Sequence, residues 1–180
     1  MVLDAEDKLD EAKYFLALMQ ENVSDSKKFK YNLSAFLAAA RSVTDILRTQ
    51  LAQKPGFRRW HDSKKKELEK NRVSKLMMDK RIYNIHLRPI NAKHHTKIET
   101  TEMIHVLDGA LVVLTHENGT KEIISSEHEP QPKAPEPTEP KITEYWFFEE
   151  CPEVDVLILC TEYLQILSNI VSESKSKFVA

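Results

Sequence analysis

The stretch that decides the fold is YNLSAFLAAARSVTDILRTQL, residues 31–51. Its apolar residues recur at steps of three and four, which places them on one face of an α-helix. These residues are Leu33, Phe36, Ala39, Ala40, Val43, Ile46, Leu47 and Leu51. Ser24 or Asp25 precedes the run at a position that suits a helix cap, and Lys54-Pro55-Gly56 ends it. The pattern therefore predicts a helix of about seven turns with one face in a core.

The same period occurs near both ends of the chain. A helix is predicted from about Asp4 to Gln20, with an apolar stripe of Leu9, Ala12, Phe15, Leu16 and Met19. Another is predicted from about Pro152 to Ser172, and the tail after Ser172 is expected to fray. Its repeating residues are Val156, Leu159, Cys160, Tyr163, Leu164, Leu167, Ile170 and Val171. We expect this last helix to pack on the bundle.

Two further helices are predicted in the middle of the chain. The first covers about Trp60–Lys70, is nearly all charged, and has Asp62 or Ser63 as its expected cap. The second covers about Val73–Leu87. It is expected to stop near Arg88, because a proline disfavours a helical conformation in the residue before it.

Strand patterns begin at Ile98. Asp108-Gly109 and Asn118-Gly119 are hairpin dipeptides between runs rich in β-branched and aliphatic residues, at about 98–107, 110–116 and 120–125. These runs predict a three-stranded meander. Residues 142–148 read as a fourth strand that rejoins it, because an isolated strand is marginally stable. Residues 127–140 between them hold five of the eight prolines, which predicts an extended loop or linker.

The predicted fold class is therefore α+β and mainly α, an up-and-down helical bundle with a small antiparallel β-meander inserted before the last helix. Residues 1–90 and 152–175 would form the bundle. Residues 96–149 would form the β insertion, with a disordered proline-rich loop at about 127–140.

Composition predicts a cytoplasmic protein with no membrane partner. No run approaches the roughly 18 apolar residues of a membrane span, and the N-terminus is acidic where a signal peptide is basic. Two cysteines, Cys151 and Cys160, are too few for a disulfide framework or a structural zinc site, and we interpret them as reduced thiols. His94-His95 and His105 lack the carboxylate or cysteine that would complete a ligand set, so we predict no metal and no other cofactor.

Charge is distributed unevenly. Residues 58–97 hold 13 Lys/Arg against four acids, whereas residues 98–180 hold five lysines against 16 acids. Either the middle of the chain faces a polyanion or the two parts attract each other; solvated helix faces of opposite sign are the alternative. The predicted RNA-binding residues are Arg58, Arg59, Lys64, Lys65, Lys66 and Arg88, with Lys70 beside them.

The aromatic run Tyr145-Trp146-Phe147-Phe148 has two interpretations. On an exposed sheet such rings stack on nucleic-acid bases. More often, four such residues in one strand are the hydrophobic face and edge of a core.

Arg81 and His86, near the end of the fourth predicted helix, are the pair with a chemical interpretation. A histidine near neutral pKa exchanges a proton during attack by a ribose 2′-hydroxyl, and an arginine stabilises the phosphate. On a helix the two side chains point about 140° apart, so they would meet in a groove formed with a second copy of the helix. Asp79 and Tyr83 share the face of His86, where either would fix the imidazole tautomer, and Asn84 shares that of Arg81.

The arginine, four-residue gap and histidine resemble the motif of the HEPN superfamily. The segments LDEAKYF (9–15) and YNLSAFLAAARSVT (31–44), followed by Pro55-Gly56-Phe57 and Trp60, are similar to a set of uncharacterised prokaryotic HEPN-like proteins. The resemblance covers about residues 3–90. Active nucleases of the family typically carry a polar residue, usually asparagine, directly after the arginine, and this position is Ile82 here.

The resemblance implies a helical bundle that forms a homodimer through the Arg81/His86 helix. HEPN relatives include metal-independent ribonucleases, toxins and non-catalytic RNA-binding proteins, so an RNA or protein partner is expected. An active endoribonuclease and an inactive binding domain both stay open. A different class of function is a protein-interaction module in which the β insertion and its acidic, proline-rich loop recruit a partner.

Overall fold

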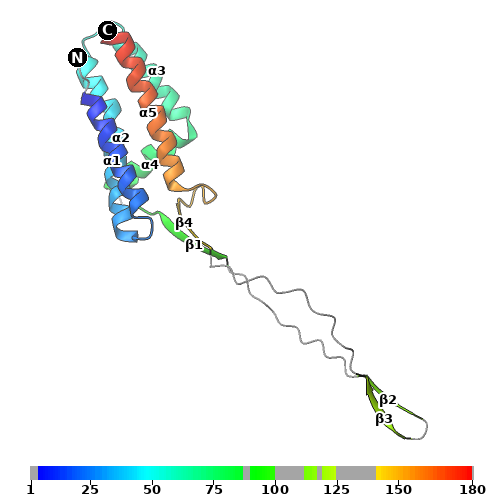
Figure 1. Cartoon of the computed structure of the whole chain (residues 1–180). Helices are drawn as coiled ribbons and strands as arrows, with labels where there is room; N and C mark the ends of the chain where they lie inside the picture. Colours follow the sequence, from blue (N-terminus) through cyan, green and yellow to red (C-terminus); the bar gives the residue numbers. More distant parts are fainter. Residues whose placement is uncertain (1–3, 87–89, 100–111, 117–118, 125–140, 180) are drawn as a thin grey trace. The chain divides into compact units, whose positions relative to one another are not determined.

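The computed structural model describes residues 4–86, 90–99, 112–116, 119–124 and 141–179. The described helices are α1 (Asp4–Glu21), α2 (Ser26–Leu51), α3 (Phe57–Lys70), α4 (Arg72–His86) and α5 (Val156–Phe178). The described strands are β1 (Lys93–Glu99), β2 (Val112–Thr115), β3 (Lys121–Ile124) and β4 (Lys141–Phe147). The fold is thus mainly helical α+β, as predicted, with an antiparallel hairpin before the last helix (Figure 1). It has two compact units, Met1–Thr96 with Glu144–Ala180, and Lys97–Thr143.

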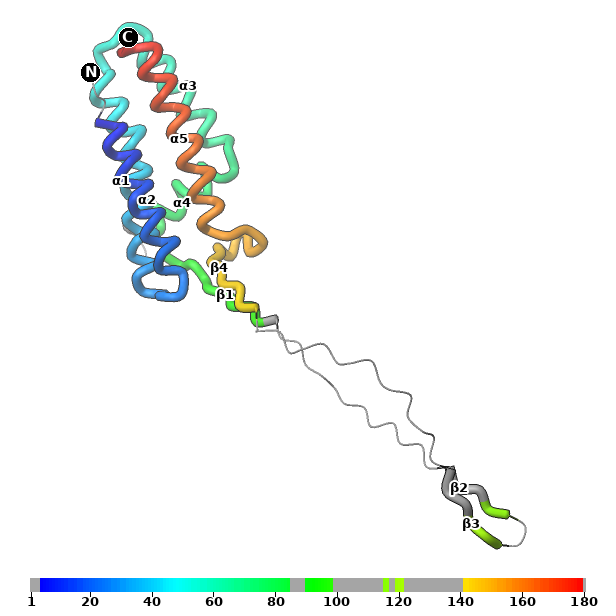
Figure 2. Tube along the Cα trace, in the orientation of Figure 1, coloured from blue at the N-terminus to red at the C-terminus, as the bar shows by residue number. Residues whose placement is uncertain are grey.

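Helix α2 is the central helix of the bundle, and it begins where the sequence predicts. The Asp25 carboxylate is its N-cap and accepts hydrogen bonds from the backbone N–H groups of Lys27 and Lys28, at 3.1 and 3.0 Å. The bond from Lys28 is the main reason that the pKa of Asp25 is lowered. Helix α1 turns back onto α2, so the two helices run side by side (Figures 1 and 2). Asp25, not Ser24, is therefore the cap.

Helix α3 begins earlier than predicted. Its first residue is Phe57, directly after Gly56, whose φ of 79° is in the left-handed region that favours glycine. The expected caps Asp62 and Ser63 instead lie inside the helix. The physical reason is Phe57, which is buried and packs against Trp60 and Phe178, so the first turn is held by the core.

Helix α5 extends past Ser172, so the expected fraying at that point is wrong. The Phe178 ring packs edge-on against Phe57 and Trp60, with ring centroids 5.3 and 5.5 Å away. The Glu173 carboxylate accepts hydrogen bonds from Lys177 at 2.6 Å and from the Trp60 indole N–H at 2.8 Å. These bonds, led by the one from Lys177, lower the pKa of Glu173 to about 2. Contacts with α3 therefore hold the final turns of α5.

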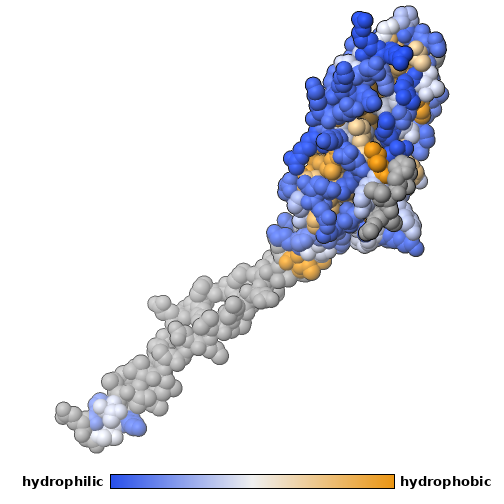
Figure 3. Space-filling model, turned by 180° about the vertical axis from the view of Figure 1, so that it is seen from behind, coloured by the Kyte–Doolittle hydropathy of each residue, from blue (hydrophilic) through white to orange (hydrophobic). Residues whose placement is uncertain are grey.

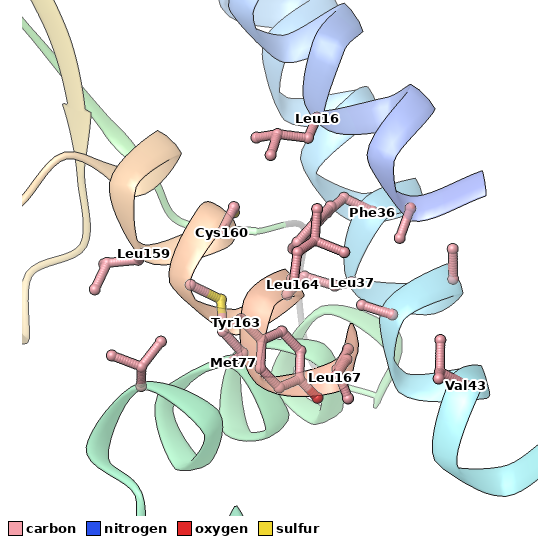
Figure 4. Close-up of a cluster of buried hydrophobic side chains, with 14 of the residues drawn as sticks. Leu16, Phe36, Leu37, Val43, Met77, Leu159, Cys160, Tyr163, Leu164 and Leu167 are labelled. Carbon is pink, nitrogen blue, oxygen red and sulfur yellow. The ribbon is translucent and has the colours of Figure 1, made fainter. Parts of the chain in front are cut away.

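The core lies where α1, α2, α4 and α5 face one another. Figure 4 shows Phe36 and Leu37 from α2 beside Met77 from α4 and Tyr163 from α5. Burial raises the pKa of Tyr163 to about 12. Cys160 is in the same core, and both cysteines are free and buried.

Among the described helices, α5 is long and apolar enough to cross a bilayer by length and composition. Its apolar residues that face the bundle core are Val156, Leu159, Cys160, Leu164, Leu167, Ile170 and Val171. The amphipathic packing of a core helix produces such a composition.

The strands form two separate pairs, β1 with β4 and β2 with β3. The predicted hairpin at 110–116 and 120–125 is confirmed by β2 and β3, which pair antiparallel from Val112 opposite Ile124. The fourth predicted strand pairs with β1, which begins at Lys93, and not with the hairpin; the first strand of the predicted meander, at about 98–107, lies mostly outside the described residues. Residues 100–111 and the proline-rich stretch at 127–140 lie outside the described residues.

Trp146 in β4 connects this strand pair to the bundle. Its ring stacks on Phe29 of α2 at 4.3 Å with an interplanar angle of 8°, and its indole N–H donates to the Val23 carbonyl at 2.8 Å. His94 of β1 packs on the same indole at 4.9 Å. Both strands are therefore fixed beside the turn between α1 and α2.

Candidate functional site

Helix α4 carries the predicted catalytic pair on its last turns. Arg81 and Asn84 follow the buried Met77 at helical spacing, so they share its face. The Asn84 amide donates to the Ser34 hydroxyl of α2 at 2.6 Å. Arg81 is half-buried, and its Nε is buried without a hydrogen-bond acceptor among the residues that the structure describes. The polar groups on this face are thus directed at the helix interface.

Asp79 and Tyr83 lie away from Arg81, as the predicted division of α4 into two faces requires. Together with Lys80, Asn91 and Glu149 they line a shallow pocket. Lys80 is held there by Glu150 at 2.7 Å and lies 4.7 Å from the centroid of the Phe148 ring. Its hydrogen bond lowers the pKa of Glu150.

The composition of this pocket does not suit a phosphate. Besides Asp79 and Glu149, Glu150 also contributes to the lining, so carboxylates outnumber the single lysine. His86 is the last residue of α4, and its side chain lies outside the described residues. Arg81, Asp79 and Tyr83 are therefore not brought together within one chain.

The predicted RNA-binding residues divide into two groups. Lys64 points toward α5. Its Nζ lies 2.9 Å from a carboxylate oxygen of Glu173 on α5 and 2.9 Å from one of Glu67 on its own helix. These hydrogen bonds, led by the one to Glu173, raise the pKa of Lys64. Lys65 lies 3.9 Å from Glu69. Carboxylates of the same chain therefore already balance the positive charges of Lys64 and Lys65.

The second group lies on the outer face of α3. Arg58, Arg59 and Lys66 are exposed and line one shallow depression with Asp62 and Ser63. Arg88 lies outside the described residues.

One row on this face holds three cations and a serine, and the Asp62 carboxylate lies beside it. Arg59, Ser63, Lys66 and Lys70 follow one another at i, i+4, i+7 and i+11, which is one side of the helix. Across the described part of the chain, the three cations have no ion-pair partner. We call these four residues the α3 basic strip.

The aromatic run of β4 alternates between two environments. Trp146 and Phe148 are buried, whereas Tyr145 and Phe147 are partly exposed on the other face of the strand. The His94 and His95 rings lie against Trp146 and Tyr145. The core interpretation of this run is correct for half of its residues.

Within the described ranges, no three His, Cys, Asp or Glu side chains gather in a metal-binding arrangement. His105 lies outside these ranges.

A pocket that sequence reasoning missed lies among α2, α3, α4 and α5. Its lining includes Arg41, Arg48 and His61, together with Leu68 and Met78. The only sequence signal was two arginines two helical turns apart on α2. The helical period of the sequence predicts that such residues face solvent. It does not show which neighbouring helices enclose them.

Comparisons of the chain with protein-family models, with curated proteins and with solved structures find no match. The resemblance to HEPN-like proteins therefore stays a prediction.

The unpaired Nε of Arg81 gives a test of whether this side chain serves the fold. We expect Arg81→Met to raise the free energy of unfolding by about 1 kcal/mol, because methionine fills the space without a buried, unsatisfied donor. The measurement is urea unfolding followed by circular dichroism.

Ser74 and Arg72, on the same helix, provide the controls. The buried Ser74 hydroxyl also lacks a partner, so Ser74→Ala should stabilise by a similar amount, about 1 kcal/mol, whereas Arg72→Met on the surface should change stability by less than about 0.5 kcal/mol. A loss of stability in Arg81→Met would mean that the guanidinium holds α4 in place.

Proposed function

We propose that this protein is a helical RNA-binding module that contacts the RNA backbone through the α3 basic strip. The observation that carries the proposal is the row of Arg59, Lys66 and Lys70, exposed and without ion-pair partners in the described chain. The row covers about 16 Å of helix, enough to meet several successive phosphates. Because Lys and Arg side chains release counterions when they meet phosphates, such a row binds RNA without sequence preference.

The resemblance to HEPN-like proteins favours RNA over an acidic protein as the partner. It also supports a homodimer through α4, where Ile82 exposes 51% of its surface beside the Arg81 face. An unpaired isoleucine on the motif helix suits a contact with a second copy.

We propose a binding function without catalysis. In this proposal Asn84 serves the interface with α2, where Ser34 engages it, and the position after Arg81 is apolar. The endoribonuclease stays a prediction with a direct test. RNA would be incubated with the protein in a chelator and compared with His86→Ala; cleavage by the wild type alone would establish the enzyme.

Charge reversal of the α3 basic strip tests RNA binding. We expect Arg59→Glu, Lys66→Glu and Lys70→Glu together to weaken binding about tenfold or more at moderate salt, and to make the slope of log affinity against log salt shallower by about 2. The measurement is fluorescence anisotropy with a labelled oligoribonucleotide over a salt series.

The matched control reverses Lys13, Lys27 and Lys28, which are exposed on α1 and α2 and change the net charge equally. This control should bind RNA nearly as well as the wild type. Equal weakening by both triple variants would indicate only a general charge effect. Full RNA affinity in the strip variant would remove the α3 surface from the proposal and favour the protein-interaction module.

A further inference from the structure

The contacts between aromatic rings show how the two strands of the β1–β4 ribbon pair. His94 lies 4.9 Å from Trp146, and the next residue, His95, lies 5.1 Å from Tyr145. Successive residues of β1 thus meet residues of β4 in reverse order, so the two strands run antiparallel with these pairs opposite each other. Side chains alternate between the two faces of each strand. One face therefore carries His94 and Trp146, and the other carries His95, Tyr145 and Phe147.

The inner face is fixed by the bundle. Trp146 is 1% exposed, stacks on Phe29 and donates its indole N–H to Val23. Lys30 lies above the same indole, 5.6 Å from the ring centroid. A shift of one residue in β4 would move this tryptophan to the solvent side, so these contacts determine which residues face outward.

The outer face carries aromatic rings where a solvated ribbon is usually polar. The Tyr145 and Phe147 rings are 6.0 Å apart at 44°, and the exposed His95 ring lies against Tyr145. Both aromatic side chains remain partly exposed, and Phe147 is outside the set of side chains that pack against the core. We call His95, Tyr145 and Phe147 the ribbon platform.

A cation lies at the rim of this platform. By the same pairing, Lys93 is opposite Phe147, and its Nζ lies 2.6 Å from Glu149. Both side chains of this ion pair are about half exposed, at 51% and 54%. Exposed pairs of this kind are weak, so a phosphate can replace the carboxylate as the partner of Lys93.

We infer that unpaired bases stack on the ribbon platform, so that the RNA bound by this protein is single-stranded. The inference rests on the proposed RNA binding and adds the class of RNA. Every base has a flat face that stacks on an aromatic ring regardless of sequence, and each such contact changes affinity by about fivefold to 150-fold. Bases inside a duplex are already stacked on one another and offer only their edges in the grooves.

The experiment compares binding of one labelled oligoribonucleotide, single-stranded and annealed to its complement, by fluorescence anisotropy. Tyr145→Leu with Phe147→Leu keeps apolar side chains and removes the flat rings. We expect it to weaken single-strand binding about tenfold or more and to leave duplex binding unchanged. Tyr145→Phe, which keeps the ring, should bind like the wild type.

Tyr14 on α1 is the matched control, because it is 61% exposed and is not in the platform. Tyr14→Leu should bind single strands normally. Unchanged circular dichroism and tryptophan emission in the double variant would show that Trp146 is still packed.

The outcomes separate this inference from the proposed function. Single-strand affinity that survives loss of both rings, or an equal loss for single strands and duplex, overturns the platform. If reversal of the α3 basic strip still weakens binding about tenfold or more in that case, the proposed function stands without the ribbon platform. A wild-type protein that binds neither form of RNA overturns both.

Discussion

Replacing Trp146 with alanine is expected to lower the free energy of unfolding by about 3–5 kcal/mol, the range for removing a fully buried large aromatic ring. The substitution deletes the stack on Phe29 and leaves the Val23 carbonyl without its indole donor. A native domain is stable by only about 5–15 kcal/mol, so the melting temperature should fall steeply. The measurement is urea unfolding of the full chain, monitored by circular dichroism.

Tyr145 is the control for this prediction, since it is the neighbouring aromatic on the opposite face. Tyr145→Ala should cost less than about 1 kcal/mol, because its ring is partly exposed. Equal losses at positions 145 and 146 would contradict the assignment of inner and outer faces to the β1–β4 ribbon. A small loss at Trp146 would mean that the ribbon does not depend on the bundle for its position.

Ending the chain at Ser172 is expected to lower the free energy of unfolding by about 3–5 kcal/mol. The estimate combines a large aromatic side chain, Phe178, with the charge-assisted hydrogen bond from Trp60 to Glu173. Differential scanning calorimetry of the two chain lengths would measure the change.

Two point variants of α5 refine this result. Phe178→Ala in the full chain should account for about 2 kcal/mol of the loss, because the ring is only half-buried. Ile158→Ala removes an exposed aliphatic side chain from the same helix and should cost less than about 0.5 kcal/mol. An unchanged melting temperature after truncation would show that the end of α5 frays in solution.

The helices were predictable because their signals are local. The apolar period of residues 31–51 and the Asp25 cap predicted both ends of α2 to within a few residues. The predicted helix ends are wrong where contacts with residues distant in sequence determine the end of a helix. Phe57 begins α3 because Phe178 and Trp60 enclose it, and α5 continues past Ser172 for the same reason. The apolar period of one segment carries no information about contacts with a distant segment.

The strands and the candidate site show the same limit. The glycine turn at Gly119 predicted the β2–β3 hairpin, since that pairing is local. The β1–β4 pairing joins residues far apart in sequence, and its Trp146 packs on Phe29 of α2. Helical spacing correctly separated Arg81 from Asp79 and Tyr83, but it did not reveal that Glu173 neutralises Lys64.

The last helix of the bundle, α5, joins the other helices only after the chain has left the bundle through β1 and returned through β4. Lys175 of α5 meets Glu6 of α1 at 2.7 Å, so residues from opposite ends of the sequence are neighbours. The entropy lost in closing such a loop grows only with the logarithm of its length, by about 0.6 kcal/mol for each doubling. The length of the segment between β1 and β4 can therefore vary widely at little thermodynamic cost to the helices.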